Sequence, residues 1–303
     1  MSKLLSLCIP TYGVSEWVFP VLESIYNQNV DESLYEVVVT DNGHNESFEK
    51  DMNELVLKHT NLIYKKTNAF SFSNEIESYK ATSGEFIKFV NHRTLMIDNS
   101  INTLIGFVKS NIDDKPFVYF SNGELHLKEE KKFDSFDSFV KELSYWSSWS
   151  TGMAFWKDDF NEIKDLPTEK FNELFPHTTI LFSQRKKSKY IVNDSVLLEE
   201  LPASVGKKGK YDLFYAFCVE YPAIILDLLR SKDISYDTYN YVLDKNLDFV
   251  AGLYFDYVYR KKECSYDISN FDNTIDIFYR KKELLKRFKK IRRKRIINKI
   301  IKR

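Results

Sequence analysis

The chain has 303 residues, of which 43% are apolar and 16% aromatic, with only 9 glycines and 7 prolines. This composition excludes a disordered or low-complexity chain, and it predicts one large core with room for a smaller appended unit. The formal net charge is zero, yet Arg280–Arg303 holds 14 of the 44 basic residues and one of the 44 acidic residues. The remaining 30 basic and 43 acidic residues make an acidic body, so the asymmetry predicts an anionic partner for the C-terminal segment.

The cysteine spacing and the hydropathy of the chain indicate in which cellular compartment the protein is expected. Cys8, Cys218 and Cys264 lie too far apart for a metal-ligand spacing or a disulfide framework, which indicates a reducing environment. The first apolar run is short, and no run approaches the roughly 18 residues that a spanning helix needs. We therefore expect a cytoplasmic protein, or one that is peripheral to a membrane.

Strand-like and helix-like patterns alternate through the first half of the chain. Strands are expected at residues 4–9, 35–40, 61–66, 85–90 and 117–120, and helices at 16–29, 46–59, 70–82 and 98–108. Asp98 is expected to cap the last of these helices. This alternation predicts an α/β fold with a mostly parallel central sheet flanked by helices.

The later patterns are less regular. We expect a helix over 134–145, a strand entered from 147–156, a helix over 171–184 with a possible break at Pro176, and a strand over 190–198. Beyond Gly206 the pattern is helical almost to the end. The predicted regions are 1–205 for the α/β domain, 206–279 for a helical C-terminal region and 280–303 for a basic tail.

Three segments carry a family resemblance: Leu7-Cys-Ile-Pro-Thr-Tyr12, Glu36-Val-Val-Val-Thr-Asp-Asn-Gly43 and Ala81-Thr-Ser-Gly-Glu-Phe-Ile-Lys-Phe89. In this order and at these intervals they resemble the GT-A family 2 glycosyltransferases, particularly the bacterial abequosyltransferase-like branch of surface polysaccharide synthesis. The resemblance covers roughly residues 3 to 200. It implies a GT-A (Rossmann-like) fold and a hexosyltransferase-type enzyme that uses a nucleoside-diphosphate sugar.

The resemblance also implies a donor site at the carboxyl ends of the strands, where ligands gather in such sheets. Residues expected to line the nucleotide, the base-side turn and the sugar or ribose are Pro10, Thr11, Tyr12, Asp41, Asn42, Asn68 and Asn74. Asp41 would accept from the N–H edge of uracil or a similar base. Plainer roles stay open: Pro10 can end a strand, Asp41 can form a turn, and Asn74 can face solvent.

The segment Asn91-His92-Arg93-Thr94 stands where the resemblance would place metal-binding aspartates. Mg²⁺ and Mn²⁺ prefer carboxylate oxygens, and an arginine cannot ligate a cation. Arg93 could instead bind two phosphate oxygens as a fork, with Asn91 and His92 beside it. We expect neither a metal nor another cofactor. A solvated turn, a degenerate domain and a metal held by other acids remain alternatives.

An inverting transferase also needs a general base near the attacking hydroxyl. The resemblance points to residues 169–182, where Glu173 and His177 are the candidates. The expected function is inverting transfer of a sugar, from a UDP-sugar or similar donor, to a hydroxyl of a lipid-linked or polymeric surface glycan. The alternative is a catalytically degenerate scaffold that tethers a partner at the membrane.

The tail interleaves Leu284, Leu285, Phe288 and Ile291 with lysines and arginines. Basic amphipathic segments bind anionic bilayers, so we expect attachment to the inner face of the cell membrane through residues 280–303. Nucleic acid is the rival partner. We do not expect it, because the tail has a single aromatic residue and the acidic body would repel a polyanion.

Overall fold

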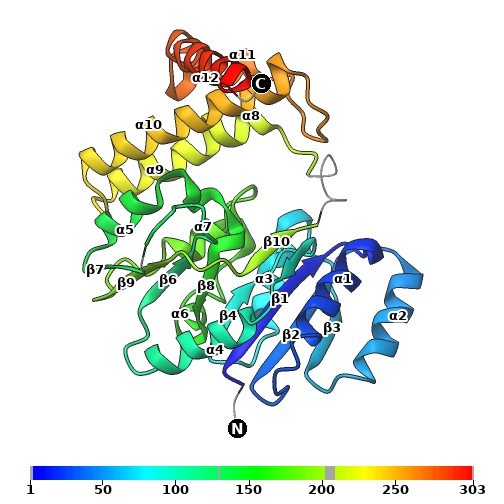
Figure 1. Cartoon of the computed structure of the whole chain (residues 1–303). Helices are drawn as coiled ribbons and strands as arrows, with labels where there is room; N and C mark the ends of the chain where they lie inside the picture. Colours follow the sequence, from blue (N-terminus) through cyan, green and yellow to red (C-terminus); the bar gives the residue numbers. More distant parts are fainter. Residues whose placement is uncertain (1–2, 129, 202–208, 302–303) are drawn as a thin grey trace. The chain divides into compact units, whose positions relative to one another are not determined.

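A computed structural model describes residues 3–128, 130–201 and 209–301 (Figure 1). The chain forms two compact units, Met1–Phe139 with Trp149–Ala203 and Val140–Ser148 with Ser204–Arg303. The sequence placed 140–148 in the first region, whereas the structure groups them with the second unit. No helix in the described ranges has the length and apolarity to cross a bilayer.

The first unit is built on an eight-stranded sheet in the order β3-β2-β1-β4-β8-β6-β9-β7. Its strands are β1 (Leu5–Thr11), β2 (Tyr35–Asp41), β3 (Leu62–Lys66), β4 (Phe86–Phe89), β6 (Phe117–Phe120), β7 (Lys131–Phe133), β8 (Met153–Trp156) and β9 (Tyr190–Asn193). Strands β3, β2, β1 and β4 are mutually parallel, as are β6 and β9, while β8 and β7 run antiparallel to their neighbours. The predicted α/β fold with a largely parallel sheet is confirmed.

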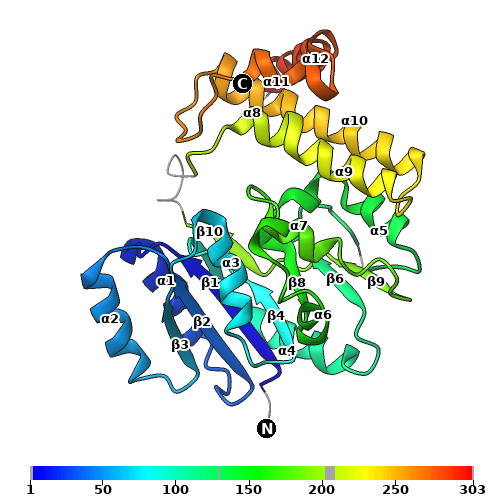
Figure 2. The same cartoon turned by 180° about the vertical axis from the view of Figure 1, so that it is seen from behind.

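Helices cover both faces of this sheet. They are α1 (Ser15–Tyr26), α2 (Glu46–Val56), α3 (Asn74–Lys80), α4 (Ser100–Asn111), α5 (Phe136–Leu143), which continues into the second unit, α6 (Lys157–Asn161) and α7 (Pro176–Leu181). Side chains alternate along a strand, so Leu5, Leu7 and Ile9 of β1 join one core with α1 and α4. Cys8 points to the other face, where its thiol lies 3.8 Å from the Ser78 carbonyl. Ser78 belongs to α3, which is labelled in Figure 2.

Several local expectations were wrong. Asp98 does not cap α4, because the residue before the helix is Asn99, in a left-handed conformation (φ 64°) and without a side-chain cap. The helix expected over 70–82 begins only at Asn74, after a 3₁₀ turn at Ser71–Ser73. Pro176 begins α7 rather than breaking a longer helix, since a first-turn residue needs no N–H donor.

The strand expected over 190–198 is also two strands. Strand β9 ends at Asn193, and β10 (Leu198–Glu200) pairs antiparallel with β5 (Thr94–Met96) in a separate two-stranded sheet. This small sheet fixes the segment that follows β4.

The second unit is helical, as expected beyond Gly206. It contains α8 (Leu213–Tyr215), α9 (Tyr221–Arg230), α10 (Tyr236–Leu253), α11 (Phe271–Phe278) and α12 (Lys281–Ile301), with π-helical stretches η6 at Ala216–Glu220 and η7 at Tyr254–Tyr259.

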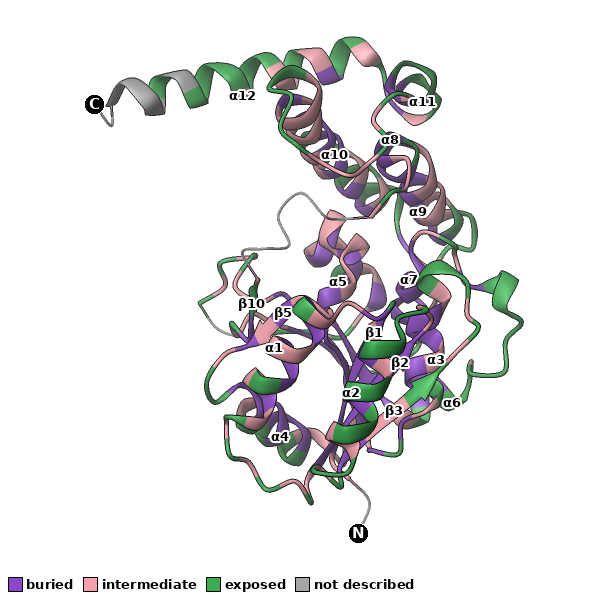
Figure 3. Cartoon of the chain, turned by 90° about the vertical axis from the view of Figure 1, so that its right-hand side faces the viewer, coloured by how far each residue is buried: buried purple, intermediate pink, exposed green. Residues whose placement is uncertain are grey.

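The first half of α12 is not a free tail. Leu284 has no exposed surface, and the Phe288 ring contacts Tyr254 and Tyr259 of η7. Arg287 also donates to the carboxylates of Asp244 and Asp248 on α10. The expectation of a separate basic tail over 280–303 is therefore corrected: its first turns belong to the core of the second unit, and exposure grows along the helix (Figure 3).

Candidate functional site

The candidate site lies at the carboxyl ends of the parallel strands. Thr11 is paired with Asp41, and Asp41 with Lys66, so these last residues of β1, β2 and β3 form one row across the sheet. The apolar residues of β1 and β2, among them Leu7, Ile9 and Val39, fill the core and leave Thr11 and Asp41 at the strand ends. Thr11 and Asp41, which the sequence analysis expected at the donor site, therefore lie side by side at one edge of the sheet.

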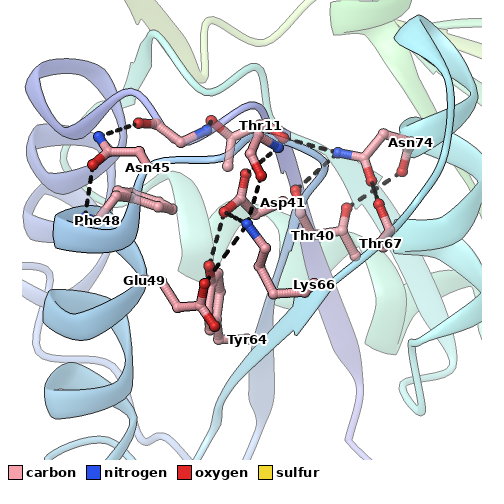
Figure 4. A network of polar contacts seen from close by, with 12 residues as sticks. Thr11, Thr40, Asp41, Asn45, Phe48, Glu49, Tyr64, Lys66, Thr67 and Asn74 are labelled. Carbon is pink, nitrogen blue, oxygen red and sulfur yellow. Dashed lines mark hydrogen bonds and ion pairs between the residues drawn. The ribbon is translucent and has the colours of Figure 1, made fainter.

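Asp41 accepts hydrogen bonds from its neighbours in and beside this row (Figure 4). It is fully buried, and its Oδ1 accepts the Gly43 N–H at 2.7 Å. Its Oδ2 accepts the Tyr64 hydroxyl at 2.8 Å and the Lys66 ammonium at 2.9 Å. The carboxylate has no exposed surface, so the expected direct contact with a nucleobase is not open to it in this conformation.

Asn74 joins the ends of three strands. Its amide donates to the carbonyls of Thr11 and Thr40 at 3.0 and 2.9 Å, and its Oδ1 accepts the Thr67 hydroxyl at 2.8 Å (Figure 4). The side chain is buried, so Asn74 neither faces solvent nor contacts a ribose in this conformation. Its role here is to hold the strand ends in place.

Two glycines shape the loops above the row. Gly13 has φ +82°, a conformation that other residues rarely adopt. A Cβ on Gly43 would lie 1.9 Å from the Tyr12 carbonyl oxygen, so only glycine fits where these two turns meet. The result is an outward-facing Tyr12, 54% exposed, beside a half-buried Pro10.

Asn42 holds the loop between β3 and α3. Its amide donates to the carbonyls of Ala69 and Ser71, at 2.9 and 3.3 Å. Within this loop Asn68 is exposed, and Phe70 exposes 77% of its surface. Asn42 therefore shapes the edge of the candidate site, as the sequence suggested for that turn.

His92 reaches the same edge from the end of β4. Its Nδ1 lies 2.9 Å from the Thr11 hydroxyl, which accepts the Gly13 N–H at 3.2 Å. In the tautomer that carries the imidazole proton on Nε2, the Thr11 hydroxyl donates to Nδ1. Burial, and then the neighbouring Arg93 charge, lower the pKa of His92 to about 3. At neutral pH the His92 ring is uncharged. Its centroid lies 5.0 Å from that of the Trp17 ring and 5.5 Å from that of the Tyr12 ring.

Arg93 supplies the positive charge at this position. Its backbone N–H donates to the Asn91 side chain at 3.2 Å, and its carbonyl accepts from Leu201 beside the β5–β10 sheet. The Arg93 side chain is 19% exposed, and its Nε lies 3.9 Å from the Glu200 carboxylate, a long ion pair that leaves the guanidinium donors available. Asn91, His92 and Arg93 thus join Thr11 and Tyr12 at one edge, as predicted.

These residues do not suit a protein-held divalent cation. The turn carries no carboxylate, His92 is already bonded to Thr11, and Arg93 cannot act as a ligand. In the described part of the chain, no three His, Cys, Asp or Glu side chains gather as a metal site requires.

The two candidate bases lie in and just before α7. His177 is in the first turn, 3% exposed, with its ring 6.2 Å from that of Phe175. Glu173 precedes the helix and is exposed. Helix α7 packs against α3, whose first residue is Asn74, so the sheet edge and the candidate bases are linked through neighbouring helices.

Sequence reasoning missed Tyr64 and Lys66, the two β3 side chains that donate to Asp41. The usable signal was their place on the strand expected over 61–66, which pairs in parallel with β2. It also missed Lys88 on β4, which is buried and donates to the carbonyls of Phe89 and Thr151.

The fold is similar to that of solved GT-A glycosyltransferases. Residues 1–349 of S. aureus TarS superpose with a TM-score of 0.56 at 14% identity, over 84% of this chain and 74% of that one. The same protein with UDP-GlcNAc gives 0.56 at 15% identity, over 84% and 73%. A mannosyltransferase, PcManGT from Pyrobaculum calidifontis with GDP-Man and Mn²⁺, gives 0.52 at 14% identity, over 83% and 75%.

These similarities confirm the predicted GT-A fold. No family model and no curated protein matches the chain. Nothing in the comparisons singles out the abequosyltransferase-like branch.

Proposed function

We propose that this protein is a glycosyltransferase that moves a sugar, with inversion, from a nucleoside diphosphate to a hydroxyl of a lipid-linked or polymeric surface glycan. The observation that carries the proposal is the strand-end row of Thr11, Asp41 and Lys66, with His92 and Arg93 beside it, in a GT-A fold. Neighbours of the same fold hold UDP-GlcNAc and GDP-Man. A UDP-hexose is the proposed donor.

In the proposed reaction the acceptor hydroxyl attacks the anomeric carbon, and the bond from that carbon to the phosphate oxygen breaks. The nucleoside diphosphate leaves with the electron pair, and the hydroxyl proton passes to a base. Glu173 is exposed and His177 is buried, so Glu173 is the candidate that an acceptor can reach without rearrangement. His177 then positions α7.

Negative charge grows on the diphosphate as the bond breaks. Because the turn after β4 holds a guanidinium and a neutral imidazole in place of carboxylates, Arg93 is the proposed counter-charge, with the His92 Nε2–H as a second donor. The protein itself would then supply the stabilisation, without a bound metal or other cofactor.

The same proposal places the protein in the cytoplasm, at the inner face of the membrane. One set of α12 residues is basic, exposed and without a carboxylate at ion-pair distance among the described side chains: Lys282, Lys286, Lys289, Lys290, Arg293 and Lys294. Anionic lipid would attract this surface, named here the α12 basic face, and bring the enzyme to a lipid-linked acceptor.

A transfer assay with UDP-, GDP- and CDP-hexoses tests the function. Wild-type protein should release a nucleoside diphosphate, and Arg93→Ala should lower turnover at least a hundredfold while changing sugar-nucleotide affinity less than tenfold, since the charge is greatest in the transition state. Arg230→Ala, at an exposed arginine of the second unit, is the matched control and should leave both unchanged. Binding without turnover in the wild type would favour the degenerate scaffold instead.

A further inference from the structure

Asp41, the carboxylate that the sequence analysis expected to bind the nucleobase, is already hydrogen-bonded within the protein. Asp41 is fully buried, and its two oxygens accept from Gly43, Tyr64 and Lys66. Because this carboxylate has no exposed surface, a nucleobase N–H cannot reach it in this conformation. Recognition of the base must therefore fall to another group at this edge.

Lys66 is that group. An ammonium has three N–H donors. One is given to Asp41 at 2.9 Å and one to the Gly43 carbonyl at 2.6 Å (Figure 4). The nearest further carboxylate is that of Glu49, at 3.9 Å and beyond hydrogen-bond reach. One N–H thus remains, on a side chain that is 34% exposed and whose ammonium is held in place by a buried carboxylate.

The loops beside this ammonium present flat apolar surfaces. Phe70 and Tyr12 expose 77% and 54% of their surface, and the Phe70 loop is fixed by the Asn42 bonds to Ala69 and Ser71. An exposed aromatic ring on a fixed loop is suited to stacking against a planar ligand. The Lys66 ammonium can donate a hydrogen bond to the edge of a heterocyclic base, and the exposed aromatic rings can stack on its face.

Resting on the proposed function, we propose that Lys66 donates its remaining N–H to a carbonyl oxygen of the nucleobase. Asp41 is then a positioning residue that fixes the ammonium. Uracil offers two carbonyl oxygens, whereas adenine offers none and would turn an amino group or a ring nitrogen toward the lysine. The site should accept a carbonyl-bearing base, with uracil preferred, and discriminate against adenine.

Calorimetry with UDP and ADP tests this, because the two ligands share the ribose and the diphosphate. The full-length wild type should bind UDP at least tenfold more tightly than ADP. Lys66→Met should lose at least tenfold in UDP affinity while ADP affinity changes less than threefold. Tyr64→Phe removes the other donor to the same Asp41 oxygen and should keep the preference within threefold. Lys66→Gln keeps a donor for Asp41 if the methionine variant unfolds, and it should show the same loss of preference.

Equal losses for UDP and ADP in these variants would assign Lys66 to the phosphates and overturn the proposal. Unchanged UDP affinity in Lys66→Gln or Lys66→Met would overturn it as well. If the wild type bound neither UDP, GDP, CDP nor ADP, the proposed function itself would fail, which is a different result from a lysine that does not read the base.

Discussion

Two buried ionisable side chains, Glu75 and Lys88, are hydrogen-bonded only by neutral groups among the contacts described. Glu75 accepts the Tyr79 hydroxyl at 2.8 Å, and burial raises the pKa of Glu75 to about 7. Burial likewise lowers the pKa of the Lys88 ammonium to about 7, although it donates to the carbonyls of Phe89 and Thr151. Both charges oppose folding, so stability should depend on pH.

For Glu75 the sign follows from proton uptake. Between its ordinary value of 4.5 and about 7, the folded protein binds a proton that the unfolded chain does not, so the free energy of unfolding falls as pH rises. Glu75→Gln should remove this loss, so its free energy of unfolding should exceed that of the wild type at pH 8 by on the order of 3 kcal/mol. Urea unfolding at pH 5 and pH 8 measures it, with Glu77→Gln on the same helix as control. An equal effect of Glu75→Gln at both pH values would contradict the assignment.

At the scale of elements, the ends of β1, β2 and β3 are joined by Asn74 at the start of α3. Asn74→Ala leaves the buried carbonyls of Thr11 and Thr40 without this donor, so we expect unfolding to become easier by about 2–3 kcal/mol. The affinity for UDP should fall with it, since the row loses its alignment. Urea unfolding and calorimetry measure the two effects, and Asn102→Ala at an exposed position of α4 is the control. A stable Asn74→Ala variant would show that the strand ends do not depend on this side chain.

Helix α12 separates into a packed part and a charged part. Replacing the lysines and the arginine of the α12 basic face by glutamine should abolish flotation with anionic liposomes and leave the thermal unfolding of the protein nearly unchanged. Leu284→Ala should instead destabilise the second unit by about 2–5 kcal/mol, because that side chain is fully buried. Deleting residues 280–303 would remove liposome binding and destabilise the second unit at once, so a deletion cannot separate the two effects. If the glutamine variant still floats, the membrane surface lies elsewhere.

The sequence predicts the strands well, because β-branched runs such as 35–40 end at polar residues wherever a buried strand reaches the sheet edge. It also predicts that Thr11, Asp41 and Arg93 gather there. It does not predict how they act. The hydrogen bonds from Tyr64 and Lys66 to Asp41 depend on β3 lying beside β2. The burial of Asn74 depends on three strand ends meeting. The docking of α12 escaped prediction for the same reason, since Leu284 and Phe288 find their partners on α10 and η7, far away in the chain.

The whole molecule combines a GT-A unit with a helical unit that carries the α12 basic face. The acidic residues of the body are used in part by α12 itself, as in the Arg287 pairs with Asp244 and Asp248. The formal net charge of zero therefore coexists with a concentrated cationic surface, the α12 basic face. At this scale we propose an enzyme whose donor site works through protein charge and whose basic helix brings it to an anionic surface.

Calorimetry of UDP binding in excess EDTA tests the central claim most directly, because the claim is that Arg93 and its neighbours hold the diphosphate without a metal. We predict that the wild type binds UDP in EDTA and that added Mn²⁺ changes the affinity less than threefold. Free UDP carries the charge that the leaving diphosphate gains in the reaction, so Arg93→Ala should weaken UDP binding at least tenfold, or about 1.4 kcal/mol, although it weakens binding of the intact sugar nucleotide less than tenfold. Binding that appears only when Mn²⁺ is supplied, or that is indifferent to Arg93→Ala, would contradict the account.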